Sequence, residues 1–127
     1  MIREIREIEP DVFSEVLRFI YTDKVEKLDE LASALMVAAD KYMLDLLKTM
    51  CEESLARNVT LDNCCELLIL AHLHSAQGLL KVLLDFVCSH SFQVAATPNW
   101  QKFLNSAHPQ LLRDISMTVM TRPSASQ

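Results

Sequence analysis

Residues 13–55 read FSEVLRFIYTDKVEKLDELASALMVAADKYMLDLLKTMCEESL, and this stretch decides the fold. Apolar residues recur through it at steps of three and four, as they do on one face of an α-helix. Polar residues interrupt the pattern at 23–28 and at the joint 38–42. The stretch therefore predicts three consecutive helices, at about 10–21, 29–40 and 43–57.

The first predicted helix begins at Pro10, because proline at a first helical position gives up no hydrogen bond. We expect its aromatic residues Phe13, Phe19 and Tyr21 to pack in the core, since aromatic stripes at helical spacing usually face inward. Asp29 is expected to cap the second helix. The residues expected to face inward are Val12, Phe13, Val16, Leu17 and Ile20 in the first helix, Leu31, Leu35, Ala38 and Ala39 in the second, and Leu44, Leu47, Cys51 and Leu55 in the third.

The second half continues in the same style. Thr60 is expected to cap a helix that runs to about Leu73, and His74-Ser75 interrupts it before a longer helix from about Ala76. Thr97-Pro98 opens a short helix, and a last helix follows the break at His108-Pro109. The inward residues are expected to be Leu79, Leu83, Phe86, Val87, Trp100, Phe103, Leu104, Leu111, Leu112, Ile115 and Val119. Residues 121–127 are predicted to be a disordered tail.

The residues before Pro10 remain open. Ile2, Ile5 and Ile8 step by three, which favours a helical turn, whereas a strand would alternate by two. A short strand, a helical turn and disorder all stay possible for this segment.

The composition favours an all-α fold. Half of the 127 residues are apolar and 23% are charged, as in an ordinary globular domain. Gly78 is the single glycine, so few residues suit positive-φ turns. The tight turns of β-hairpins, which usually need glycine, are therefore not expected.

The charge pattern speaks against nucleic acid and membrane as partners. The net charge is −5, and the basic residues are scattered singly, whereas phosphate-backbone binding needs a clustered basic stripe. No apolar run reaches the length of about 18 residues that a membrane span requires. The N-terminus is too charged for a signal peptide, so Asn58-Val59-Thr60 is not expected to be glycosylated. The four cysteines, which lie inside helical apolar patterns, suit buried reduced thiols of a nuclear or cytoplasmic protein.

The patterns offer little for catalysis, metal binding or a cofactor. His72 and His74 together with Cys64 and Cys65 could suggest zinc, but an i, i+2 pair on a helix points to different faces. A Cys88–His90 nucleophile would need an oxyanion site, which nothing in the pattern supplies. One glycine cannot build a phosphate-cradling loop. We therefore expect no enzyme, no metal and no cofactor.

Several short segments give the chain a family resemblance. In order and spacing they resemble the MATH-BTB family of speckle-type POZ proteins, from about Ile8 to Val119. The segments are Glu9–Phe13, Phe19–Thr22, Ala38–Tyr42, Leu47–Lys48, Met50–Glu52, Leu68–Ala71, Leu73–Ala76 and His108–Pro109. The resemblance implies that residues 1–57 are the C-terminal part of a BTB/POZ domain. It makes residues 58–120 a helical extension, the 3-box followed by a BACK-like region.

The resemblance also implies a function. Members of this family are substrate adaptors of cullin-3 RING ubiquitin ligases, in which the BTB domain and the 3-box hold the cullin and a MATH domain recruits substrate. The cullin-facing positions implied for this chain are Tyr42, Met43 and Asp45 at the joint of the second and third helices, and Leu61, Asp62, Cys65, Glu66, Ile69 and His72 in the 3-box.

The chain departs from the family in three respects. No segment of these 127 residues resembles a MATH domain or the upstream BTB half, which in the family supplies the dimer interface, the sheet and an acidic loop. Ser116 stands where the last helix of the family often carries an aromatic dimer contact. We also expect apolar faces of the first three helices to be exposed.

Three function hypotheses follow from these features. The first is a protein-interaction module that binds cullin-3 within a ubiquitin-ligase complex. The second is a regulatory product that co-assembles with other BTB proteins without recruiting substrate. A small helical enzyme or metal protein is the third.

Overall fold

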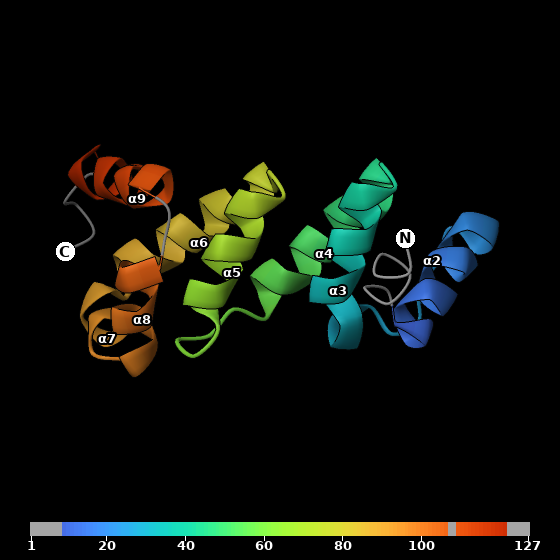
Figure 1. Ribbon diagram of the computed structural model, residues 1–127, viewed down its shortest axis with the longest axis horizontal. Helices are drawn as coiled ribbons and strands as arrows, with labels where there is room; N and C mark the ends of the chain where they lie inside the picture. The colour runs from blue at the N-terminus through green and yellow to red at the C-terminus, as the bar shows by residue number, and fades with distance from the viewer. Residues whose placement is uncertain (1–8, 107–108, 122–127) are drawn as a thin grey trace. The chain divides into compact units, whose positions relative to one another are not determined.

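The protein is all-α in the part that the structure describes, residues 9–106 and 109–121 of a computed structural model (Figure 1). Residues 1–8, where strand, helix and disorder were left open, lie outside the described residues. The helices are α2 (Pro10–Thr22), α3 (Leu28–Lys41), α4 (Asp45–Arg57), α5 (Cys64–Leu73), α6 (Gln77–Ser89), α7 (Ser91–Ala95), α8 (Pro98–Ser106) and α9 (Pro109–Thr121). Thr121, predicted to begin the tail, ends α9, and the remainder of that tail is outside the described residues.

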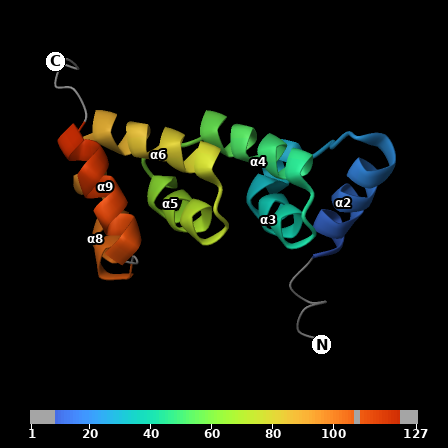
Figure 2. The same ribbon diagram turned by 90° about the horizontal axis from the view of Figure 1, so that it is seen from above.

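The chain divides into two compact units, Met1–Arg57 and Asn58–Gln127. The division falls between the same two residues at which the sequence analysis separates a BTB part from a helical extension. In the first unit α3 packs against both α4 and α2 (Figure 2). In the second unit α6 packs against α5, α7 and α9, while α8 packs against α5 and α7.

The core of the first unit is a seam between α3 and α4, with one face of α2 added. Most of the predicted inward residues of α3 and α4 are buried, although Leu31 and Leu44 are only partly so. The buried apolar side chains of this unit are Val12, Val16, Phe19, Ala32, Leu35, Met36, Ala38, Ala39, Leu47, Cys51 and Leu55.

The face of α2 that contacts the core differs from the predicted one. Phe13, Leu17 and Ile20 are exposed, and so is Tyr21 at 83%. Phe19 is buried, as expected. The prediction was wrong for the other four because apolar residues cover more of the circumference of α2 than a single packing partner, α3, can bury.

Asp29 does not cap α3, contrary to the prediction. The helix begins one residue earlier, at Leu28, and its N-cap position, Lys27, forms no side-chain cap hydrogen bond. The Asp29 carboxylate instead accepts a hydrogen bond of 2.5 Å from the hydroxyl of Ser54, which is fully buried, and lies 3.6 Å from the Arg57 guanidinium. Asp29 therefore ties the start of α3 to the end of α4.

A second polar contact holds the connection between α2 and α3. Glu15 is buried, and its carboxylate accepts a hydrogen bond of 3.0 Å from the backbone N–H of Glu26. The Arg18 guanidinium lies 3.6 Å from Glu15 and 3.5 Å from Glu26. The buried carboxylate is thus paired and hydrogen-bonded, as a buried charge requires.

The second unit has a core of its own. Its buried apolar side chains are Cys64, Cys65, Leu67, Leu68, Ala71, Ala76, Leu79, Leu80, Leu83, Val87, Val94, Phe103, Leu111 and Ile115. Phe86, Trp100 and Leu112, predicted to face inward, are half-buried, and Leu104 and Val119 are exposed. The Trp100 ring stacks on Phe103 at 5.1 Å.

Thr60, predicted to cap the helix that runs to Leu73, lies in the turn before α5, whose N-cap position is Asn63 and forms no side-chain cap hydrogen bond. The Thr60 hydroxyl accepts a hydrogen bond of 3.2 Å from the backbone N–H of Asn63, and the Asn63 side chain accepts one of 2.8 Å from the backbone N–H of Thr60. This reciprocal pair closes the turn that leads into α5. A turn at residues 61–63 precedes the regular helix, which begins at Cys64.

Replacing Ser54 tests the tie between α3 and α4. We expect Ser54→Ala to lower the stability of the first unit by about 1 kcal/mol, because the hydrogen bond to the carboxylate is lost while Asp29 can still be hydrated. The control Arg57→Ala should lower the free energy of unfolding by less than about 0.5 kcal/mol, since both partners of the Arg57–Asp29 ion pair are exposed.

The aromatic residues allow the two units to be followed separately during urea unfolding. The single tryptophan, Trp100, lies in the second unit, and both tyrosines lie in the first. Ser54→Ala should shift the unfolding seen by near-ultraviolet tyrosine dichroism and leave the Trp100 fluorescence transition in place. An unchanged tyrosine transition would contradict the proposed role of Ser54.

Candidate functional site

The joint between α3 and α4 is a tight turn built without glycine. The backbone N–H of Leu44 donates to the Ala39 carbonyl at 2.8 Å, and that of Met43 donates to the Asp40 carbonyl at 3.3 Å. These two bonds are the Schellman pattern of helix termination, in which glycine is the usual residue at the left-handed position. Met43 occupies that position here, with φ of 60°.

The turn places apolar side chains on the surface. Met43 is 82% exposed, and Tyr42 and the following Leu46 are also exposed. Asp45, exposed in the first turn of α4, adds a negative charge beside them. We name these four residues the joint surface. Leu46, which follows the predicted contact residue Asp45 directly, was missed by the sequence analysis.

Charged side chains fix and flank the joint surface. The Lys48 ammonium lies 2.9 Å from the Asp40 carboxylate, which links the last turn of α3 to the first turns of α4. The Lys41 ammonium lies 6.0 Å from the centre of the Tyr42 ring, at the outer limit of a cation–π contact. Residues 1–57 contain eight Lys and Arg against thirteen Asp and Glu, so the whole net charge of −5 resides in the first unit.

The six predicted 3-box residues of the second unit fall into two sets. Asp62 and Glu66 are exposed and Ile69 is half-buried, and their spacing of four and three residues places them on one side of the helical segment. Leu61 and His72 are half-buried, while Cys65 is only 3% exposed and belongs to the core. The structure therefore brings together three of the six on an accessible face.

The accessible face of α5 continues to its C-terminal end. Leu73, four residues after Ile69, is 58% exposed and was missed by the sequence analysis. We name Asp62, Glu66, Ile69 and Leu73 the α5 face. A shallow groove of about 560 Å³ beside Leu73 is lined by His72, Pro109 and Gln110 as well. The Asn99 side-chain amide donates to the Asp62 carbonyl at 2.9 Å, which ties α8 to the turn that begins this face.

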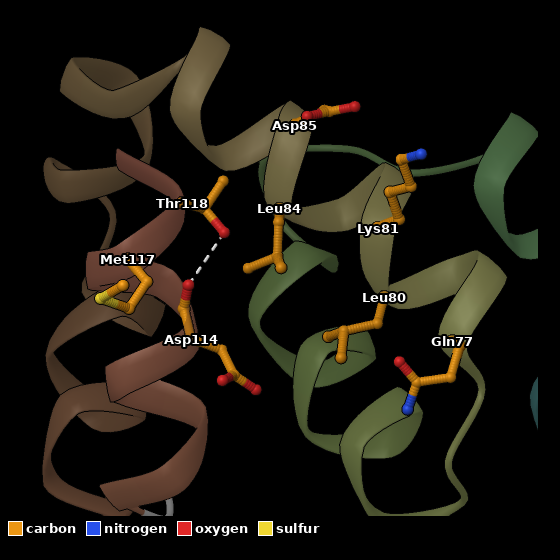
Figure 3. A pocket seen from close by; sticks show the side chains of 8 residues that line it. All are labelled: Gln77, Leu80, Lys81, Leu84, Asp85, Asp114, Met117 and Thr118. Atoms are coloured by element: carbon orange, nitrogen blue, oxygen red, sulfur yellow. Dashed lines mark hydrogen bonds between the residues drawn. The ribbon is translucent and has the colours of Figure 1, made fainter. Parts of the chain in front are cut away.

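The second unit also has a groove between α6 and α9, of about 490 Å³ (Figure 3). Leu80 and Leu84 of α6 and Met117 of α9 give it apolar walls, and Asp85 and Asp114 lie on opposite sides. The Thr118 hydroxyl donates to the Asp114 carbonyl at 2.8 Å. The Thr118 hydroxyl is therefore already hydrogen-bonded within α9 and is not activated as a nucleophile by a neighbouring base among these contacts.

The histidines and cysteines considered for metal or nucleophilic chemistry do not form a shared site in the described part of the chain. Among residues 9–106 and 109–121 there is no group of three or more His, Cys, Asp or Glu that could hold a metal ion. The His90 ring stacks on Phe86 at 4.3 Å, and its Nδ1 lies 3.0 Å from the Phe86 carbonyl oxygen. His90 is therefore engaged at the end of α6.

All four cysteines are free, and three of them are buried. Burial, with a smaller effect of Glu52, raises the pKa of the Cys51 thiol to about 12. A hydrogen bond with Cys64, together with burial, raises the pKa of Cys65 well above its usual range. These two thiols are poor nucleophiles at neutral pH, because the thiolate is the reactive form.

Residues 2–59 match the BTB/POZ domain. The matched range contains all of the first unit except Met1 and therefore includes the joint surface. BTB/POZ domains are protein-interaction modules, so the match and the exposed apolar joint agree on the class of function. None of the described helices combines the length and apolarity needed to cross a membrane.

Substitution of Met43 tests the strain at the joint. We expect Met43→Gly to be more stable than Met43→Ala by about 1 kcal/mol, because a left-handed conformation costs a residue with a Cβ roughly 1–2 kcal/mol. The two variants remove the same exposed side chain and differ in backbone freedom. Urea unfolding followed by tyrosine dichroism measures the difference, and equal stability would show that the turn is unstrained.

The raised pKa of Cys51 predicts a loss of stability in alkaline solution. The thiol stays protonated in the folded state and ionises near pH 9 when unfolded, so the unfolded state binds fewer protons above that pH. Stability should fall by up to about 1.4 kcal/mol per pH unit between pH 9 and about 12. Cys51→Ala should lower stability at pH 7 but flatten this slope, and an unchanged slope in that variant would contradict the assignment to Cys51.

Proposed function

We propose that this chain is a non-catalytic docking module that binds the N-terminal helical region of cullin-3, as part of a ubiquitin-ligase adaptor. The observation that carries the proposal is the BTB/POZ match of residues 2–59 together with the exposed apolar joint surface inside it. The nucleus or the cytoplasm is the proposed location, and nucleic acid and membranes are not among the proposed partners.

The joint surface suits the binding of a helix. Tyr42 and Met43 in the turn and Leu46 in the first turn of α4 supply apolar anchors of the kind that helix-in-groove contacts use. Aromatic and methionine side chains are enriched in the centres of interfaces, and methionine adapts to irregular partner surfaces. The left-handed turn fixes the backbone of Met43, and its side chain is 82% exposed.

The α5 face is the second proposed contact, which corresponds to the 3-box. Ile69 and Leu73 supply apolar area, while Asp62 and Glu66 supply charge at its edge. Cys65 and the half-buried Leu61 and His72 support this face from the side of the core. BACK-like structure for the rest of the second unit is part of the same proposal.

The charge of the first unit indicates the chemistry of the partner. Because the net charge of −5 lies in residues 1–57, a partner with basic residues beside its apolar anchors would be steered to the joint. The on-rate should therefore fall as ionic strength rises, while the apolar anchors mainly set the dissociation rate.

Titration calorimetry with the cullin-3 N-terminal domain tests the proposal. Met43→Asp and Ile69→Glu should each weaken binding by about 2 kcal/mol, roughly thirtyfold, if these residues are anchors. Leu61→Glu should likewise weaken binding while leaving the helical dichroism largely intact. The matched control is Val82→Glu, an exposed apolar residue on α6 that belongs to neither surface.

The result distinguishes the two interaction hypotheses. Binding that Met43→Asp and Ile69→Glu weaken supports the cullin-3 adaptor. No binding to cullin-3, with binding to a full-length BTB protein instead, would overturn it in favour of the regulatory product that co-assembles with BTB proteins. Binding to cullin-3 that neither substitution affects would remove both surfaces from the proposal.

A further inference from the structure

Met43 presents a thioether to solvent within the joint surface. Its side chain is 82% exposed, and its backbone lies in the left-handed turn between α3 and α4. The other two described methionines of the first unit are covered, since Met36 is fully buried and Met50 is half-buried. In the described part of the first unit, Met43 therefore carries the most accessible sulfur atom.

The cysteine sulfur atoms are less accessible to an oxidant than the sulfur of Met43. Cys51, Cys64 and Cys65 are buried, and Cys88 is half-buried. Burial raises the pKa of the Cys51 thiol to about 12, so this group stays in its unreactive protonated form at neutral pH. A thioether has no proton to lose before it reacts, so exposure decides which methionine an oxidant attacks.

We propose that Met43 is a site of reversible oxidation by hydrogen peroxide, and that its sulfoxide weakens docking at the joint surface. The inference rests on the proposed function, because it concerns regulation of the same surface. In the reaction a sulfur lone pair attacks one peroxide oxygen, the O–O bond breaks and an S–O bond forms. The sulfur loses two electrons, and the other oxygen leaves as water with both protons of the peroxide.

The sulfoxide changes the polarity of the joint surface without changing its charge. A thioether is apolar and accepts hydrogen bonds weakly, whereas the sulfoxide oxygen is polar and hydrated. Burying that oxygen against apolar groups of a partner removes its hydration without a replacement hydrogen bond, which is unfavourable. Because the Met43 side chain is exposed in the free protein, its oxidation should alter binding and leave the core of the first unit intact.

The second unit offers an internal comparison. Met120, near the end of α9, is 79% exposed, so it should oxidise about as readily as Met43. It belongs to neither the joint surface nor the α5 face, and its oxidation should leave binding unchanged. Exposure thus predicts which methionines react, and position predicts which reaction affects docking.

Peptide mapping by mass spectrometry tests the modification itself. The folded full chain is treated with hydrogen peroxide, catalase then removes the peroxide, and the oxidised fraction of each methionine is followed with time. Met43 and Met120 should react at similar rates. Met36 should react at least about tenfold more slowly, because its sulfur is reached when the unit opens locally. Oxidation of Met43 as slow as that of Met36 would overturn the inference.

Titration with the cullin-3 N-terminal domain tests the effect on docking. Peroxide treatment of this chain, with the peroxide removed before the partner is added, should weaken binding about tenfold. The two methionine sulfoxide reductases, one for each sulfoxide epimer, should restore binding with dithiothreitol. The sulfoxide then returns to the thioether and water, while two dithiothreitol thiols form a disulfide. Recovery with dithiothreitol alone would assign the effect to a cysteine and overturn the inference.

Two matched variants locate the effect. Met43→Leu keeps an apolar side chain without sulfur, and its affinity, whatever its value, should not change on peroxide treatment. Met120→Leu should stay as sensitive to peroxide as the natural chain. Equal sensitivity of Met43→Leu, or untreated binding that peroxide leaves unchanged, would overturn this inference alone. No binding by the untreated chain would instead overturn the proposed function, and the inference with it.

Discussion

The packing of α3 against α4 is the interaction on which the first unit depends. Fully buried side chains on both helices, among them Leu35, Met36 and Leu47, form the seam. Each such side chain contributes roughly 1.5–3 kcal/mol, whereas an exposed ion pair contributes at most about 1 kcal/mol. The polar contacts of Asp29 and Asp40 therefore set the register of the two helices, and the apolar seam supplies most of the stability. The joint surface exists because the seam holds the two helices on either side of a short turn.

The scarcity of glycine shapes the ends of the helices. The described residues contain three positive-φ positions, Asp23, Met43 and Ser75, and none of them is glycine. Ser75 ends α5 as Met43 ends α3, since the backbone N–H of Ala76 donates to the Ala71 carbonyl at 2.9 Å. At the end of α3 the residue in the left-handed conformation, Met43, is also the most exposed residue of the joint surface. A local strain and a candidate contact thus coincide at one residue, as they often do at functional sites.

The sequence predicted the helices well, because apolar periodicity reports which residues share a face. It could not tell which side of α2 would be buried, since that depends on the position of α3 and not on α2 itself. The five-residue helix α7 was not anticipated, because Ser91–Ala95 is too short to show a period. Of the nine predicted contact residues, most are at least partly exposed, and burial of Cys65 follows from the fold of the second unit. Three positive-φ positions among the described residues agree with the expectation of few such turns, but Asp, Met and Ser occupy them in place of glycine.

The central claim is that the exposed apolar side chains at the α3–α4 joint form a docking surface for a protein partner. Amide hydrogen exchange of the full chain, with and without the cullin-3 N-terminal domain, tests it most directly. The account predicts that added protection is concentrated at residues 42–46 and along α5, with the groove between α6 and α9 unaffected. Protection confined to that groove, or no change anywhere at saturating partner, would contradict the account.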